Sequence, residues 1–229
     1  QGCRRSQRSR RCGLNPQHGE HRLSETTLMI SEHTFAAIDF ESAGAERGKT
    51  DVPVQIGMAT WSLPAGHADH FTSFIRADQN ITWSAQKVHG ISSDDLADAP
   101  ALMQLWPSIK ATLSGRIVVA HGHGTEKRYL RAFPNHGFGP WADTLQLSRA
   151  AWPELKSHAL GDVCNHWNLT PQIDKLVTGK TWHDALYDAA ASLVLLEYII
   201  DQFDLVKSDP EPLLKPDTSY WHSLKRRDS

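Results

Sequence analysis

The sequence has few cysteines and no long hydrophobic run. Only 3 of the 229 residues are cysteine, an odd number without a CxxC pair. Neither a disulfide framework nor a four-cysteine zinc site is therefore expected, and a reducing, cytoplasmic setting is predicted. No apolar stretch reaches the roughly 18 residues that a membrane span needs. The sequence predicts a globular protein without a membrane span or a membrane partner.

Positive charge is scarce in the part of the chain that carries hydrophobic patterning. Residues 1–28 contain six arginines against two glutamates, a net charge of +4, which leaves 18 basic and 24 acidic residues elsewhere, a net charge of −6. Proteins that bind nucleic acid mainly through clustered Lys and Arg are basic, so this class is disfavoured. Divalent metal ions could still reconcile an acidic domain with a phosphate substrate.

The composition divides the chain into three parts. Residues 1–28 are polar and lack hydrophobic periodicity, and we expect them to form a disordered basic extension. Residues 29–205 carry the pattern of one folded domain, which is large enough for its own core. Residues 206–229 contain three prolines, and we expect a loosely ordered C-terminal tail there.

Strand-like and helix-like patterns alternate within residues 29–205. Three β-like runs joined by short turns predict an antiparallel meander, and a helix followed by a short apolar run implies a crossover to a parallel strand. A long helix from about 184 to 203 closes the domain, with Asp184 as its N-cap. The expected fold is α/β, a mixed sheet covered by helices. The expected strands are 35–40, 52–61, 70–75, 117–120 and 141–144, and the expected helices are 102–113, 125–133, 160–167 and 184–203.

Acidic side chains occur at the ends of these elements. Asp39 and Glu41 lie two residues apart in the first strand, so both project from one face, roughly 7 Å apart. Glu126 begins a short helix, where the helix dipole alone favours a carboxylate. Asp188 lies among small and apolar residues of the long helix, where a carboxylate is costly unless it is paired or bound to metal. Each residue taken alone has an ordinary structural explanation.

His183 precedes Asp188 by five residues, which is about 140° around a helix. Both side chains can therefore face one site only if His183 lies in the preceding loop or in the first turn. A single histidine in a chain that contains 13 is usually a surface residue. His183 becomes a candidate catalytic residue only when Asp188 and the other acidic residues are considered with it.

Three motifs occur in the order found in one family of nucleases. They are AAIDFESAG around Asp39, IVVAHGHGTEKRYL around Glu126, and His183 followed by Asp188 after four residues. The segments KVHGISSDDLADAP and WADTLQLSRAAWPELKSHAL between them match as well. Over residues 35–203 the chain resembles a DEDDh 3'-5' exonuclease of the proofreading-exonuclease superfamily. The resemblance implies a ribonuclease H-like fold, a mixed five-stranded sheet flanked by helices.

The resemblance also implies catalytic roles. Asp39, Glu41, Glu126 and Asp188 resemble the ligands of two divalent metal ions. All-oxygen ligation favours Mg²⁺ or Mn²⁺ over zinc, so one of these is the expected cofactor. His183 resembles the general base that takes a proton from the attacking water.

Further residues are implied as substrate contacts. Phe40, Ser42 and Ala43 would hold the 3'-terminal nucleotide, and His121 would contact a phosphate, although a structural role for His121 is an equal alternative. The second motif departs from the family pattern H-N-x-x-F-D, because this chain has HGHGTE at 121–126. Its glutamate keeps the charge and adds one methylene group, so the ligand can still reach the ion if its backbone or rotamer adjusts, and the sequence does not fix the effect on metal geometry and rate.

The expected function is that of a metal-dependent 3'-5' exonuclease, contained in residues 29–205, that shortens single-stranded DNA or RNA with a free 3' end. One alternative is an exoribonuclease of the same family that trims RNA ends, because the metal site acts on the phosphate and not on the sugar. The other is a catalytically weak nucleic-acid-binding module. The presence of all four carboxylates argues against this second alternative. Clustered negative charges repel one another and lower the stability of the protein unless they bind metal. The sequence does not reveal whether the chain serves a polymerase or another protein partner.

Overall fold

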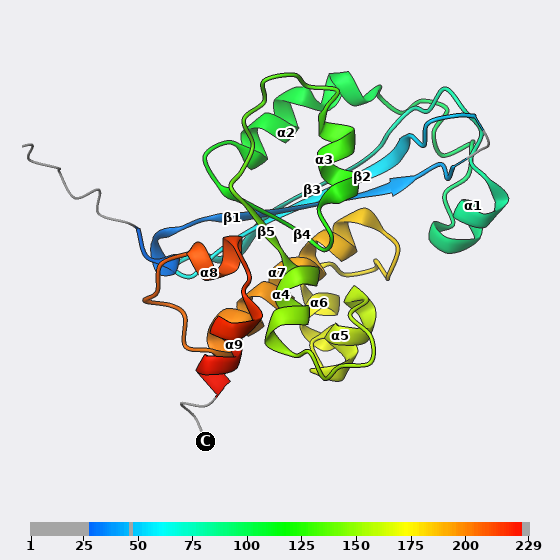
Figure 1. Ribbon diagram of the computed structural model, residues 1–229. Coiled ribbons are helices and arrows are strands. Elements are labelled where there is room, and N and C mark those ends of the chain that lie inside the picture. The colour runs from blue at the N-terminus through cyan, green and yellow to red at the C-terminus, as the bar shows by residue number, and fades with distance from the viewer. Residues whose placement is uncertain (1–27, 46–47, 226–229) are drawn as a thin grey trace, which may run out of the picture.

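A five-stranded mixed sheet forms the centre of the protein (Figure 1). The computed structural model describes residues 28–45 and 48–225, so nearly all of the expected basic extension lies outside the described residues. The strands are β1 (Phe35–Ser42), β2 (Pro53–Ser62), β3 (Gly66–Phe74), β4 (Ile117–Ala120) and β5 (Trp141–Asp143). Their order is β3-β2-β1-β4-β5, with antiparallel β1–β2 and β2–β3 pairs and parallel β1–β4 and β4–β5 pairs. The predicted mixed five-stranded sheet is confirmed.

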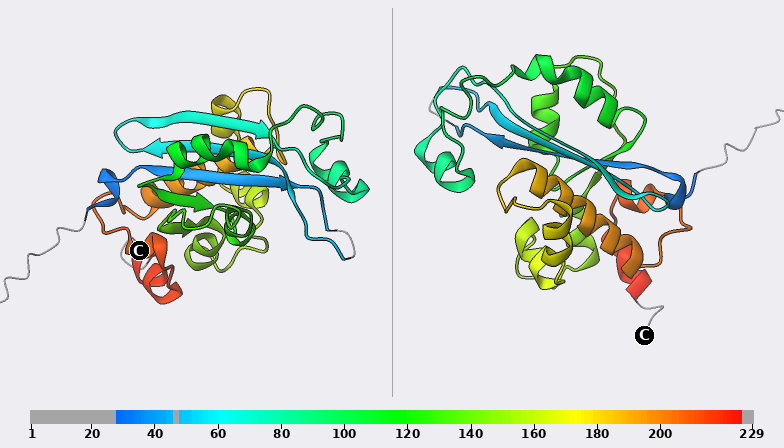
Figure 2. Two further views of the ribbon diagram at one scale, coloured as in Figure 1. Left: turned by 90° about the horizontal axis from the view of Figure 1, so that it is seen from above. Right: turned by 180° about the vertical axis from the view of Figure 1, so that it is seen from behind.

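Helices cover both faces of this sheet. They are η1 (Ile30–Glu32), α1 (Trp83–His89), η2 (Leu102–Leu105), α2 (Trp106–Leu113), α3 (Gly124–Leu130), α4 (Thr144–Ala151), α5 (Leu160–His166), α6 (Thr170–Leu176), α7 (Ala185–Gln202), α8 (Glu211–Leu214) and α9 (Thr218–Lys225). Figures 1 and 2 show α2 and α3 on one face and α7, with α4 to α6, on the other. Within the described ranges, no helix has both the length and the apolar character needed to cross a bilayer.

The side chains of β1 divide between two hydrophobic cores. Phe35 and Ala37 belong to the core that α7 covers, whereas Ile38 belongs to the core that α2 and α3 cover. Alternate residues of a strand face opposite sides of a sheet. Asp39 and Glu41 therefore continue the α7 side of the strand, where the core ends and polar side chains begin.

The segment after residue 205 is more ordered than the sequence predicts. It forms α8 and α9, and both Leu213 and Trp221 are fully buried. Trp221 packs edge-on against Phe203 at the end of α7, with ring centroids 4.9 Å apart. The prolines correctly indicated irregular connections, but Leu213 and Trp221 join the core and Val206, Leu214 and Leu224 pack against it. The expectation of a loosely ordered tail is wrong for residues 206–225.

We expect Trp221→Ala to lower the free energy of unfolding by about 3–5 kcal/mol, because truncation of a buried tryptophan leaves a cavity. Urea unfolding followed by circular dichroism measures this change. Tyr220→Ala is the matched control, since Tyr220 is 37% exposed and its loss should cost only about 0.5 kcal/mol. Equal, small effects of the two changes would contradict the packing of α9.

Candidate active site

The C-terminal end of β1 and the N-terminal end of α7 meet in one acidic region. One potential ligand atom each from Glu41, His183 and Asp188 lies within 4.8 Å of the other two. Asp39 lies two residues before Glu41 on the same face of β1, and burial, followed by the charges of Asp188, Glu126 and Glu41, raises its pKa well above the usual range. The structure thus brings Glu41, His183 and Asp188 together, and Asp39 interacts through its charge with this group and with Glu126.

The start of α7 reaches this region because β2 has no side chain at Gly57. A Cβ atom at this position would collide with the backbone of Ala185 and Leu186. Gly57 is also the β2 partner of Asp39 in the register of the sheet. The first turn of α7 therefore lies directly over the strand pair that carries the first carboxylate.

Gln55 of β2 binds the same turn of α7 through both ends of its amide. Its Nε2 donates to Asp184 Oδ2 at 3.0 Å and its Oε1 accepts from the Ala185 N–H at 3.0 Å, and the side chain is almost fully buried. Lys180 Nζ donates to the same Asp184 oxygen at 2.8 Å. The other oxygen of Asp184 accepts from the Leu186 N–H at 3.1 Å, so the predicted N-cap is confirmed.

His183 lies in the loop immediately before this capped turn, as its spacing from Asp188 requires. Its backbone has φ of 69°, in the left-handed region, and its side chain is exposed. Its N–H donates to Asp188 Oδ2 at 3.3 Å. This hydrogen bond ties the histidine backbone to the carboxylate that the predicted mechanism pairs with it.

Burial raises the pKa of three of the carboxyl groups. It raises the pKa of Glu41 to about 8, with further contributions from the charges of Asp188 and Asp184. It raises the pKa of Asp188 to about 7, against the lowering effect of the His183 N–H. It also raises the pKa of Glu126 to about 7, although a backbone hydrogen bond opposes this effect.

Two of these carboxylates carry oxygens without a partner. Among the described residues, neither Glu126 Oε2 nor Asp188 Oδ1 has a hydrogen-bond partner, although both atoms are buried. Buried polar atoms are normally satisfied, and an unpaired buried carboxylate oxygen is costly. Carboxylate oxygens are the ligands that hard divalent cations prefer. Asp39, Glu41, Glu126 and Asp188 therefore fit the divalent cations that the sequence predicts.

The loop before Glu126 is held by Asp143 at the end of β5. One carboxylate oxygen of Asp143 accepts from the N–H groups of Gly122, Leu145 and Gln146 at 2.9, 3.0 and 3.3 Å. Gly122 has φ of 84°, a conformation that few residues other than glycine adopt readily. The loop thus keeps a defined shape although it lacks the asparagine of the family pattern.

The α3 helix that carries Glu126 is also tied to the end of β1. The Tyr129 hydroxyl donates to Asp51 Oδ2 at 3.1 Å, and Asp51 Oδ1 accepts from the Gly44 N–H at 2.9 Å. Arg128 adds an ion pair to Asp51 at 3.5 Å. These contacts brace α3 where the chain lacks the phenylalanine of the family pattern.

His121 has a structural role in this site. Its Nε2 donates to the His158 carbonyl at 2.8 Å, and its Nδ1 lies 3.0 Å from Thr144 Oγ1. Burial lowers the pKa of its ring, which favours the neutral form. Since both ring nitrogens contact protein atoms, the structure favours the structural alternative over the predicted phosphate contact.

The residues expected to hold the 3'-terminal nucleotide differ in what they expose. Phe40 is buried and packs edge-on against Tyr129, with centroids 5.3 Å apart, so its side chain belongs to the core. Ala43 is fully buried, and its N–H and carbonyl are bonded to Val52 and Thr82 at 2.9 and 2.7 Å. Ala43 therefore has no free backbone N–H or carbonyl with which to bind the nucleotide as predicted. Ser42 is half-buried and stays a candidate.

Sequence reasoning missed Gln55 and Asp143 as residues that shape the site. Gln55 interrupts the apolar run PVQIGMA, and Asp143 directly precedes a helix at a strand end. A polar residue inside an otherwise buried strand needs a partner, and an aspartate before a helix is typical of an N-cap. Both signals were present, but neither reveals which distant segment the side chain binds.

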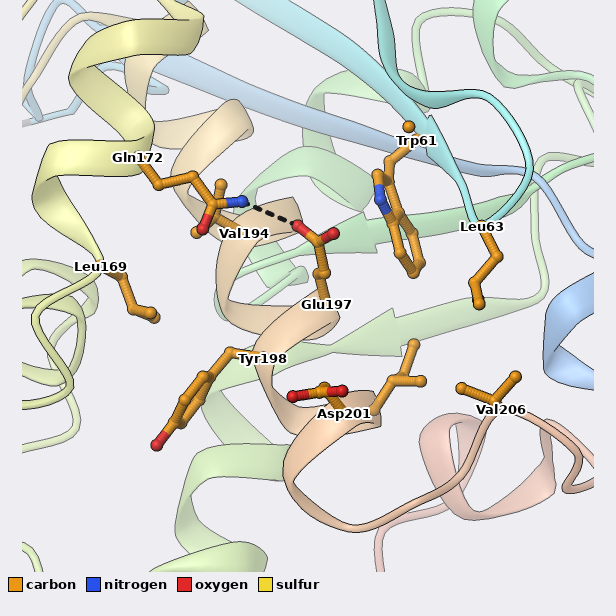
Figure 3. A pocket seen from close by; sticks show the side chains of 11 residues that line it. Trp61, Leu63, Leu169, Gln172, Val194, Glu197, Tyr198, Asp201 and Val206 are labelled. Carbon is orange, nitrogen blue, oxygen red and sulfur yellow. Dashed lines mark hydrogen bonds between the residues drawn. The ribbon is translucent and has the colours of Figure 1, made fainter.

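A separate cavity of about 380 Å³ lies at the opposite end of α7 (Figure 3). Trp61, Leu63 and Tyr198 contribute to its walls, and Glu197 lies inside it with a 2.9 Å hydrogen bond from Gln172. Trp61 pairs with the first residue of β1, whereas the acidic residues lie at the other end of that strand. This cavity is not part of the candidate active site.

We expect Gln55→Ala to lower the free energy of unfolding by about 1–3 kcal/mol, because it leaves the buried N–H of Ala185 without a partner. Thermal and urea unfolding measure this effect. Gln172→Ala is the control, since it removes an exposed hydrogen bond at the far end of the same helix. If both changes cost the same, Gln55 would have no special role in holding α7.

The raised pKa values of Glu41, Glu126 and Asp188 predict a pH-dependent response to cations. The folded, metal-free protein binds more protons than the unfolded chain between about pH 4 and pH 8, so these groups make it progressively less stable as pH rises through that range. Cations compete with these protons. We therefore expect Mg²⁺ to raise the melting temperature more at pH 8.5 than at pH 5.5.

Differential scanning fluorimetry with Mg²⁺ or EDTA at both pH values measures this difference. Asp188→Asn should reduce the Mg²⁺ effect, whereas Asp204→Asn, an exposed change beyond the far end of α7, should leave it intact. The same Mg²⁺ effect at both pH values would show that the acidic residues do not bind the cation.

Comparison with known sequences relates this chain to exonucleases and to one class of polymerase. Residues 36–196 match the model of the RNase_T exonuclease family. The DNA polymerase III PolC-type of Bacillus cereus is 27% identical over 179 residues, which are 76% of this chain and 12% of that protein. The corresponding protein of Thermotoga maritima is 26% identical over 148 residues, 62% of this chain and 10% of that protein. The chain thus spans about an eighth or less of these curated relatives.

Solved structures agree with this relation at the level of the fold. Exonuclease X in complex with 5' overhanging duplex DNA is 23% identical, with a TM-score of 0.64 over 79% of this chain and 99% of that one. Exonuclease I is 14% identical, with a TM-score of 0.58 over 84% of this chain and 44% of that one. The expected ribonuclease H-like fold is confirmed. Because the family match runs from β1 into α7 and includes every acidic residue of the site, the chain belongs to the RNase_T exonuclease family of DEDD-type 3'-5' exonucleases.

Proposed function

We propose that this chain is a metal-dependent 3'-5' exonuclease that hydrolyses single-stranded nucleic acid from its free 3' end. The observation that carries the proposal is the cluster of Glu41, His183 and Asp188, whose potential ligand atoms lie within 4.8 Å of one another. The cluster lies between β1 and the capped start of α7, both of which are fixed by packing. Membership of the exonuclease family supports the same activity.

Asp39, Glu41, Glu126 and Asp188 would hold two divalent cations, Mg²⁺ or Mn²⁺. When bound, such ions neutralise the charge of the phosphodiester, make water more acidic and stabilise the leaving oxygen. The chain contributes ligands on two rigid elements and on α3, which Asp143 and Asp51 hold in place. Because these elements are rigid, the carboxylates would be held in position for the cations before substrate binds.

His183 would be the general base that removes the proton from the attacking water. Its side chain is exposed, so the ring can approach a substrate phosphate and can return the proton to solvent afterwards. Its backbone is held by Asp188, and the adjacent Asp184 is held by Gln55 and Lys180. A positioned base of this kind contributes roughly 10²- to 10⁴-fold to the rate.

The substrate class follows from the chemistry of the cation site and from the relatives. A cluster of carboxylates repels a polyanion unless cations intervene, so binding of a nucleic acid strand and of metal should depend on each other. Exonuclease X has been solved with duplex DNA that carries a 5' overhang, and that relative supports a DNA end as one substrate. The site acts on the phosphate, so RNA ends remain the alternative substrate.

We expect the protein to shorten 5'-labelled single strands stepwise from the 3' end with Mg²⁺ or Mn²⁺, and not with EDTA. DNA and RNA of matched sequence, resolved on denaturing gels, measure the direction and the sugar preference. His183→Ala should lower the rate about 10²- to 10⁴-fold. His222→Ala, an exposed histidine on α9, is the matched control and should keep the wild-type rate.

Changes at Glu126 separate the proposal from its alternatives. Glu126→Gln removes the charge and should abolish turnover, whereas Glu126→Asp restores the family residue and should keep or raise the rate. Degradation of RNA alone would favour the RNA-trimming alternative. If the wild type binds either strand but degrades neither with Mg²⁺ or Mn²⁺, the proposal is overturned. The chain would then be a nucleic-acid-binding module.

A further inference from the structure

The most exposed large hydrophobic side chain in the described part of the protein is Trp83, at the start of α1. It is 75% exposed, whereas the next, Met103, is 58% exposed. An indole contributes more apolar area than any other side chain, and leaving it in water forgoes the free energy of its burial. A single exposed side chain is not by itself evidence of a binding site, so the position and surroundings of Trp83 carry the argument.

The α1 helix borders the candidate active site. The Thr82 N–H donates to the Ala43 carbonyl at 2.7 Å, and His89 Nε2 donates to the Ser42 carbonyl at 3.0 Å. Both ends of α1 are thus fixed to the two residues that follow Glu41. His89 and Asp184, the N-cap of α7, also line one small cavity, so α1 and the start of α7 face each other across it.

The surroundings of Trp83 combine an aromatic face with positive charge. Lys87 lies one helical turn further on, with its Nζ 5.1 Å from the centroid of the Trp83 ring. Lys87 is itself exposed. An aromatic ring beside a cation is the arrangement with which proteins hold single-stranded nucleic acid, by stacking on a base and attracting the adjacent phosphate. The acidic domain has a net charge of −6 outside residues 1–28, so a local cation is needed to hold a polyanion.

We propose that Trp83 and Lys87 form a strand-binding site beside the catalytic centre. Trp83 stacks on one unpaired base of the strand upstream of the scissile linkage, and Lys87 contacts a neighbouring phosphate. The inference rests on the proposed function, because it assigns the nucleic acid substrate of that function to this surface. A lysine over a tryptophan at this helical spacing could instead stabilise only α1, and the experiment separates the two roles.

The test moves a single abasic nucleotide along a fluorescein-labelled DNA strand of 12 nucleotides with hydrolysis-resistant phosphorothioate linkages at its 3' end. Fluorescence anisotropy with Mg²⁺ gives the dissociation constant for each position. The wild type should lose about 5- to 150-fold in affinity when the abasic nucleotide reaches the position that contacts Trp83. Trp83→Ala should bind the intact strand weakly, and no abasic position should weaken its binding further in this way. Trp83→Phe should restore both the affinity and the sensitivity to that one abasic position.

Lys87→Ala should weaken binding at every abasic position and reduce its salt dependence. Met103→Ala, the control, should behave as the wild type. An unchanged abasic profile in Trp83→Ala would overturn the proposal, as would a uniform loss together with a lower melting temperature. In kinetics with a second 12-nucleotide strand that has ordinary phosphodiester linkages, Trp83→Ala should raise the KM for this strand more than the KM for a p-nitrophenyl ester of thymidine 5'-phosphate.

Failure of the proposed function gives a different result. If the wild type cleaves neither the strand nor the nucleotide ester, the exonuclease proposal fails, while the abasic profile still decides whether Trp83 binds a base. If the wild type cleaves both and Trp83→Ala has the wild-type profile, the exonuclease proposal stands and the strand-binding site is rejected.

Discussion

The close approach of α7 to β2 at Gly57 is the constraint on which the whole site depends. Gly57 pairs with Asp39, and Gln55 pairs with Glu41, so each carboxylate of β1 lies beside a β2 residue that contacts the start of α7. A side chain at position 57 would push the helix away from the sheet. Asp188 would then move away from the strand carboxylates, and the distances between the cation ligands would change together.

The same contact concentrates negative charge where water is scarce. Burial and mutual repulsion raise the pKa of Asp39 well above its usual range and that of Glu41 to about 8. The carboxylates keep their positions because backbone packing and the hydrogen bonds of Gln55 and Asp184 hold the elements that carry them. The site is therefore preorganised for the cation that we propose, and its carboxyl groups hold protons to a higher pH than exposed ones do.

The sequence predicted the parts of this structure that depend on local patterns. The strands followed from their apolar runs, and the carboxylates and His183 followed from motifs of fixed spacing. The short helices α1, α4 and α6 were not predicted; α1 has no buried residue and α6 has only Ile173, so neither shows an apolar period. The role of Gln55 depends on a partner about 130 residues away, and the burial of Trp221 depends on the end of α7. Neither distance is visible in a single sequence.

The glutamate at position 126 is one methylene group longer than the aspartate of the family pattern, and it lies in a helix that neighbouring contacts hold in place. One additional methylene group must be accommodated either by a shift of α3 or by the side chain itself. Contacts from Asp143 to Gly122 and from Asp51 to Tyr129 hold α3 on both sides of Glu126, so a shift of the helix is opposed. The longer side chain, which is only 5% exposed, must then carry its carboxylate further into the acidic region. We therefore expect Glu126 to act on the spacing and choice of the cation that we propose, because the contacts around α3 oppose a movement of the helix.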